Sequence, residues 1–239
     1  FKLKFPQVTK LWGSVKKLIQ DIKDNSVESS IKRYRRQSEP EPYYGVPMGR
    51  LKAMAKPHLK DNQLAVELWN TGILDAQILA VHMVDPKTID AKTLWSWCDP
   101  EVSTMVLDKL VGSVISVRDD AETFEEKLLA DEDPKRERIG WNLTTRRVVK
   151  GKLSDEELTE LFQRIKETLP VAEEPLKWSV NHCLCEMGVY NDDWTDRCIS
   201  FGEENGAYKE MKVAKGCTSA YAPEWIRVAK ANREKRLKK

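Results

Sequence analysis

Residues 64–86 read LAVELWNTGILDAQILAVHMVDP, and this stretch decides the fold class. Its apolar residues recur three and four positions apart, as Leu64 and Leu68 do, which is the spacing of one helix face. Gly72 interrupts the pattern and leaves a short link between two helical halves. Because short links make consecutive helices antiparallel neighbours, the stretch predicts one packed helix pair.

The same helical spacing continues on both sides of this pair. Further apolar stripes are Val8, Leu11, Trp12, Val15, Leu18 and Ile19; Val102, Val106, Leu110 and Val114; and Leu158, Leu161, Phe162 and Ile165. Three helix starts are predicted. Ser154 and Glu157 have the spacing of a capping box, and Asp133-Pro134 and Asp99-Pro100 each place a capping residue directly before a proline. Strand-like alternation is nearly absent, since the one candidate, residues 111–117, fits a helix end better.

Breakers divide the chain into about a dozen predicted helices of about 10–16 residues. Helix pairs in series predict an all-α fold, an α-solenoid of antiparallel pairs with a concave surface. No exact repeat period is present, so degenerate HEAT-like repeats fit better than a regular array, with a compact bundle as the alternative. We expect residues 1–239 to form a single domain that ends in a basic C-terminal helix and tail.

The composition is that of a globular protein. The chain has 239 residues and is 41% apolar, which excludes disordered and fibrous classes. No window is apolar enough to predict a membrane-spanning helix, and the opening FKLKFPQVTKLWGS has no apolar signal region. Five cysteines without a C-x-x-C pair indicate a reduced chain, so we expect a cytoplasmic protein.

Charge is distributed unevenly along the chain, although the net charge is only +2. Residues 1–60 carry 14 Lys and Arg against 5 Asp and Glu, and residues 209–239 carry 10 against 3, while the middle is acidic. Within that middle, residues 135–152 form a basic island. A polyanion held by these stretches is one interpretation. Solvated helix surface, with the island paired to the acidic run 119–133, is the other.

No motif points to a metal or a cofactor. Cys183 and Cys185 lie beside His182, but side chains two apart on a helix point in nearly opposite directions, so we interpret them as core or surface thiols. Phosphate-binding and dinucleotide-binding glycine loops are absent, as is the G-x-S-x-G motif.

Core packing is the default expectation for the eight tryptophans. It is clearest for Trp69, Trp141 and Trp225, and less clear for Trp95, Trp97, Trp178 and Trp194.

Asp108 is the one acid that the pattern singles out. It lies in STMVLDKLVGSV, a predicted helix with aliphatic neighbours, and Thr104 is one turn before it. A carboxylate beside an apolar stripe costs free energy unless it is hydrogen-bonded or functional. An exposed acid at the edge of the stripe is the alternative interpretation.

Five segments together resemble the AlkD-like DNA alkylation repair family, a bacterial group with HEAT-like repeats. They are YYGVPMGRLKAMAK at 43–56, LAVELWNTGILDAQILAVHMVDP at 64–86, RIGWNLTTRRVVKG at 138–151, EEPLKWSVNHCLCEMGVYN at 173–191 and VAKGCTSAYAPEWI at 213–226. The resemblance implies a DNA glycosylase that excises cationic N3- and N7-alkylpurines from duplex DNA without base flipping. A non-catalytic HEAT-like module that binds DNA or protein is the alternative.

The resemblance also implies roles for individual residues. The family aspartate lies eleven residues after a tryptophan, and Trp97 places it at Asp108; a competing register places it at Asp99. Arg138 corresponds to a phosphate-contacting arginine. Two positions that hold aromatic residues in the family correspond to Thr104 and His182 here, so both aromatic walls of the family's site are altered in this chain. The expected catalytic residue is Asp108, and the expected DNA-binding residues are Arg138, His182, Trp178, Thr104, Arg146 and Arg147.

The expected partner is alkylated double-stranded DNA. Because no motif for either is present, we expect no cofactor and no metal, and we expect no membrane partner. We expect the protein to act as a monomer.

Overall fold

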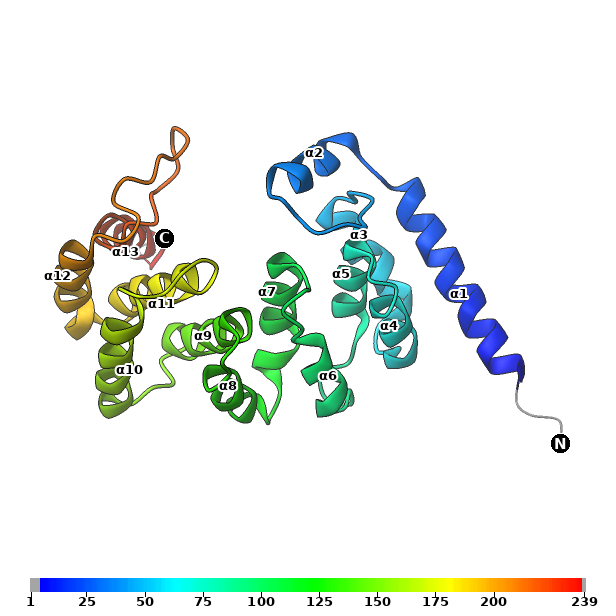
Figure 1. Ribbon diagram of the computed structural model, residues 1–239, viewed down its shortest axis with the longest axis horizontal. Helices are drawn as coiled ribbons and strands as arrows, with labels where there is room; N and C mark the ends of the chain where they lie inside the picture. The colour runs from blue at the N-terminus through cyan, green and yellow to red at the C-terminus, as the bar shows by residue number, and fades with distance from the viewer. Residues whose placement is uncertain (1–4, 238–239) are drawn as a thin grey trace. The chain divides into compact units, whose positions relative to one another are not determined.

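The computed structural model describes residues 5–237 and is all-helical over that range (Figure 1). Thirteen α-helices and three short 3-10 helices lie within these residues. The chain divides into two compact units, one up to Ala121 and one from Glu122 onward. None of the described helices is both long and apolar enough to cross a membrane.

The first unit holds the helices from α1 to η2. They are α1 (Phe5–Asp24), α2 (Glu28–Arg36), α3 (Met48–Ala55), η1 (Lys56–His58), α4 (Asn62–Trp69), α5 (Leu74–Met83), α6 (Ala91–Trp97), α7 (Thr104–Ser113) and η2 (Ile115–Val117). The second unit holds α8 (Ala121–Leu129), α9 (Pro134–Val149), α10 (Asp155–Thr168), α11 (Leu176–Tyr190), η3 (Asp192–Trp194), α12 (Thr195–Asn205) and α13 (Ala222–Leu237).

Helix α5 forms the centre of the first unit, where α3, α4 and α7 pack against it (Figure 1). Nine of its ten residues are buried, as expected for a helix that is apolar on all sides. Next to it, the rings of Trp69 and Trp97 stack with centroids 4.2 Å apart. The helix pair predicted from residues 64–86 is therefore confirmed as α4 and α5, which pack against each other.

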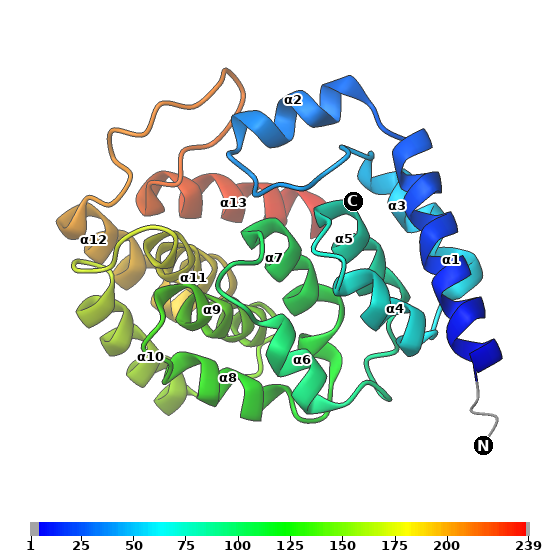
Figure 2. The ribbon, with the colours of Figure 1, turned by 45° about the vertical axis from the view of Figure 1, so that its right-hand side comes forward.

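Helix α11 has the same position in the second unit, where α9, α10, α12 and α13 pack around it (Figure 2). Ten of its 15 residues are buried. Cys183 and Cys185 belong to this core, and burial raises the pKa of the Cys183 thiol to about 12. Both thiols therefore serve packing, which is one of the two interpretations given by the sequence.

Two of the three predicted helix starts are confirmed. Ser154 and Glu157 form the capping box of α10, with both reciprocal hydrogen bonds present, and Asp133 caps α9 ahead of Pro134. The third is wrong, because α7 begins at Thr104 rather than at Asp99. The Asp99 carboxylate accepts a hydrogen bond from the N–H of Glu101 and so closes a turn, while Ser103 caps the helix.

The structure also refines predicted helix lengths and tryptophan burial. Helices α3 and α4 have eight residues and α6 has seven, shorter than expected, because packing against neighbours stabilises helices too short to form alone. Burial of Trp69 and Trp141 is confirmed, and Trp97 and Trp194 are buried as well. Trp225 is only half-buried.

Candidate functional site

Asp108 lies at an open hollow on the first unit. The hollow has a volume of about 400 Å³ and is lined by Gln37, Glu39, Thr104, Met105, Asp108 and Lys109. The α7 residues come from the first turns of that helix, and Gln37 and Glu39 directly follow α2. Asp108 is exposed and Thr104 is half-buried. The structure thus brings together two of the predicted site residues, one helical turn apart.

The segment that follows α2 is held in place by a buried carboxylate. Asp75, in the first turn of α5, is fully buried and accepts hydrogen bonds from the backbone N–H groups of Tyr44 at 2.6 Å, Gly45 at 3.1 Å and Val46 at 2.8 Å. Gly45 has φ +75°, and a Cβ there would lie 2.7 Å from the backbone nitrogen of Ile31. Three donors and a tight approach therefore fix residues 44–46, at the far end of the segment that begins at the hollow.

Arg138 and Arg146 lie on α9 in the second unit and differ in exposure. Arg138 is only 5% exposed, whereas Arg146 is exposed. Two residues after Arg138, Gly140 lies so close to α8 that a Cβ would be 2.8 Å from the backbone nitrogen of Leu129. Gly140 therefore lets α8 and α9 approach closely, and this packing positions the N-terminal half of α9.

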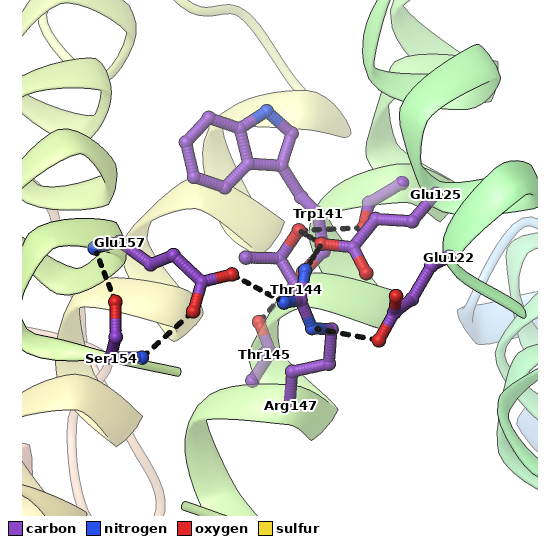
Figure 3. A network of polar contacts seen from close by, with 9 residues as sticks. Glu122, Glu125, Trp141, Thr144, Thr145, Arg147, Ser154 and Glu157 are labelled. Atoms are coloured by element: carbon purple, nitrogen blue, oxygen red, sulfur yellow. Dashed lines mark hydrogen bonds and ion pairs between the residues drawn. The ribbon is translucent and has the colours of Figure 1, made fainter. Parts of the chain in front are cut away.

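Arg147 is bound by three carboxylates of its own unit (Figure 3). Its guanidinium lies 2.7 Å from Glu157, 3.3 Å from Glu125 and 3.9 Å from Glu122. Burial opposes the charge of Arg147, but the carboxylates around it raise its pKa. Because Glu157 belongs to the capping box of α10, the network ties α9 to both α8 and α10.

Glu125 is the buried member of this network. It is 5% exposed, and burial raises its pKa even though the Thr144 hydroxyl donates a hydrogen bond to it at 2.7 Å. Arg136 also approaches an acid of the 119–133 run, with its guanidinium 3.6 Å from Asp131. Two arginines of the basic island are thus paired with the acidic run, as the alternative to polyanion binding expects for them.

Trp178 and His182 lie one turn apart on α11 and each meets an aromatic ring of the same unit. Trp178 is 39% exposed and packs edge-on against Tyr208, with ring centroids 5.6 Å apart. His182 packs edge-on against Trp225 at 5.9 Å, and its Nε2 is 3.2 Å from Glu186. This face of α11 therefore presents a half-exposed aromatic surface.

No group of three or more His, Cys, Asp or Glu side chains suited to hold a metal occurs among residues 5–237.

The predicted site residues are divided between the two units. Thr104 and Asp108 belong to the first unit. The other predicted site residues, Arg138, Arg146, Arg147, Trp178 and His182, belong to the second.

Comparison with known proteins shows the family. The model of a family described as DNA alkylation repair enzyme matches residues 15–226. The chain belongs to the DNA alkylation repair enzyme family. The expected resemblance is therefore confirmed over nearly the whole chain.

Relatives of this DNA alkylation repair family member include two Listeria proteins described as uncharacterized. Lin0241 of Listeria innocua is 28% identical over 203 residues, covering 83% of this chain and 88% of the relative. Lmo0209 of Listeria monocytogenes is 25% identical over the same coverage.

A solved structure with a TM-score of 0.78 and 22% identity covers 92% of this chain and 94% of its own. It is described as a new family of proteins related to the HEAT-like repeat DNA glycosylases with affinity for branched DNA structures. The likeness confirms the expected HEAT-like fold.

Sequence reasoning about this family member missed Glu39 and Ser103. Glu39 lies in a segment that the sequence identifies only as a break between helices, and Ser103 lies just before α7. In the structure the Ser103 hydroxyl donates a hydrogen bond to Glu39 Oε2, so the two residues join the α2 end to the α7 start. A serine directly before a helix is a recognisable cap, but its second partner 64 residues away leaves no local signal.

Proposed function

We propose that this protein is a DNA glycosylase that releases cationic N3- and N7-alkylpurines from duplex DNA. The observation that carries the proposal is the Asp108 carboxylate at an open hollow, with Thr104 one turn before it. A cationic base is already a good leaving group, so the protein needs mainly to stabilise the positive charge that develops on the sugar. A fixed carboxylate supplies that stabilisation.

The remaining expected residues would hold the DNA. Arg146, which is exposed, would contact a backbone phosphate, and Arg138, which is 5% exposed, would have to turn its guanidinium outward to contact one. Trp178 and His182 would pack against sugars through the half-exposed aromatic surface of α11. Arg147 would not contact the DNA, because three carboxylates of its own unit already bind its guanidinium. The hollow at Asp108 is open, which suits reaction on a nucleotide that is not flipped into a deep pocket.

Replacement of Asp108 tests this function directly. Asp108→Asn keeps the size of the side chain and deletes its charge, so release of N7-methylguanine from alkylated duplex should fall by about 100-fold or more. Affinity for the duplex should hardly change. The measurement is single-turnover base release followed by chromatography, with filter binding for affinity.

Asp99→Asn is the matched control for the catalytic test. It removes the same charge from the same unit, but Asp99 does not line the hollow. A wild-type rate in Asp99→Asn beside a slow Asp108→Asn would support Asp108 as the catalytic carboxylate. A slow Asp99→Asn beside a fast Asp108→Asn would reverse the assignment, and absence of release by the wild-type protein would overturn the glycosylase function.

A second candidate function is binding of branched DNA without base release. Affinity for branched DNA is described for the solved structure of similar fold, and Thr104 stands where the resemblance expects an aromatic wall. Under this function a four-way junction would bind more tightly than a duplex of equal length, and alkylated bases would stay attached. Measuring both affinity and release on the same substrates separates the two candidates.

A further inference from the structure

Two carboxylates from distant parts of the chain share the hollow of the first unit. Asp108 comes from α7, and Glu39 comes from the segment that follows α2. Lys109 lines the same hollow and offsets part of their charge. The proposed function gives a role to Asp108 only, which leaves Glu39 to be explained.

The backbone of Glu39 is fixed by the way α2 ends. Ser38 has the left-handed φ of +53°, its N–H bonds to Arg35 O at 3.0 Å, and the N–H of Glu39 bonds to Tyr34 O at 3.0 Å. These two bonds form a Schellman motif, which satisfies the last carbonyls of the helix. Tyr34 is fully buried, so the motif anchors Glu39 to the core of the unit.

The side chain of Glu39 is oriented by Ser103, which is 4% exposed. The Ser103 hydroxyl donates its only proton to Glu39 Oε2, and its oxygen accepts the N–H of Met105 at 3.1 Å as the cap of α7. A carboxylate has about four acceptor sites, so Glu39 retains capacity to accept from water. The positive end of the α7 dipole also favours a negative charge here.

We propose that Glu39 is the proton acceptor for the water that attacks the sugar. This inference rests on the proposed glycosylase function. The water oxygen bonds to C1′ as the N-glycosidic bond breaks, and the bonding electron pair leaves with the base, which becomes neutral. The proton lost by the water passes to the Glu39 carboxylate.

The two carboxylates then divide the work. Asp108 stabilises positive charge on the sugar while the bond to the base breaks. Until water has added and lost its proton, the base can return to the sugar, so removal of that proton makes the cleavage productive. General base assistance of this kind contributes about 100-fold to 10,000-fold to a rate.

The test replaces Glu39 by its amide. Glu39→Gln can still accept the Ser103 hydrogen bond but cannot take a proton, so single-turnover release of N7-methylguanine should fall by about 100-fold. Sodium azide attacks C1′ without losing a proton. We therefore expect azide to restore release by Glu39→Gln and to leave a glycosyl azide detectable by mass spectrometry.

Glu41→Gln is the matched control, because Glu41 is exposed on the same segment and does not line the hollow. It should release base at the wild-type rate. A wild-type rate in Glu39→Gln, or a slow rate that azide does not restore, would overturn the proton-acceptor role while the glycosylase function stands. Absence of release by the wild-type protein would instead overturn both.

Discussion

At the scale of single residues, two polar side chains of α5, Asp75 and His82, have contrasting environments. Asp75 is surrounded by three backbone N–H donors, which stabilise a charge that burial alone would destabilise. His82, on α5, has a buried Nε2 that makes no hydrogen bond within the described structure. Burial lowers the pKa of His82, and the charges of Lys109 and Lys52 lower it further.

The lowered pKa of His82 predicts acid sensitivity. Between the folded pKa and the ordinary value of 6.5, the unfolded chain binds more protons than the folded chain. The contribution of His82 to the free energy of unfolding is therefore complete above pH 6.5 and is lost as pH falls through the folded pKa. The slope cannot exceed about 1.4 kcal/mol per pH unit for one proton. Urea denaturation between pH 5 and 7.5 measures it.

His82→Gln should flatten this dependence. Glu125 has the opposite effect on the pH dependence. Burial raises the pKa of Glu125, so the contribution of Glu125 to the free energy of unfolding is lost as pH rises above the ordinary pKa of a glutamate. The difference between the wild-type and His82→Gln curves therefore isolates the histidine. His58→Gln removes another histidine of the same unit, from η1, and is the control; flattening of equal size in this variant would show that the effect is not specific to His82. Parallel curves for wild type and His82→Gln would contradict the assignment.

At the scale of elements, the approach of α8 to α9 depends on Gly140. In Gly140→Ala the new Cβ would lie 2.8 Å from a backbone nitrogen and 2.9 Å from Leu129 Cγ, so one helix must shift. Overpacking of this kind costs about 1–3 kcal/mol, and the gain in helix propensity returns only about 0.5–1 kcal/mol. We expect a net loss of about 1–2 kcal/mol in the free energy of unfolding, measured by urea denaturation.

Gly49→Ala in α3 is the control for this helix contact. No atom outside its local backbone lies within 4 Å of a Cβ at Gly49, so the substitution should leave stability unchanged or raise it by up to about 1 kcal/mol. Equal stability changes in the two variants would show that the approach at Gly140 imposes no steric limit.

The elements themselves were largely predictable because their signals are local. Apolar spacing and the caps at Ser154 and Asp133 depend on residues a few positions apart, and these predictions are confirmed. The site was only partly predictable. Asp108 and Thr104 are one turn apart on the same helix. Glu39, in contrast, is placed at the hollow by the end of α2 and by the Ser103 hydroxyl, and Ser103 lies 64 residues away and leaves no local signal.

At the scale of the whole molecule, part of the uneven charge is used to hold the fold. In α13, Lys230 lies 2.8 Å from Asp192, Arg227 lies 2.9 Å from Glu203, and Arg233 donates to the Val189 carbonyl near the end of α11. Arg147 is likewise bound within its own unit. Net charge along the sequence therefore overstates the cations available to a polyanion.

Exposed cations remain on α9 and just after it. Arg146 and Lys150 are both exposed, and they belong to the basic island predicted from the sequence. Under either proposed function, such residues would contact backbone phosphates and release bound counterions. Binding should then weaken steeply as salt is added.

Salt dependence of duplex binding tests this use of charge. With about six phosphate contacts, affinity should fall by about a thousandfold between about 50 and 200 mM salt. Arg146→Gln combined with Lys150→Gln should reduce the slope of log affinity against log salt by about 2, because each contact contributes about 0.9.

Lys87→Gln is the control for this salt dependence, because it removes an exposed cation outside the basic stretches and should leave the slope unchanged. An equal reduction by Lys87→Gln would reveal a diffuse charge effect without defined contacts. A flat salt response in the wild-type protein would argue against both DNA functions and leave a protein-binding scaffold, because phosphate neutralisation cannot occur without counterion release.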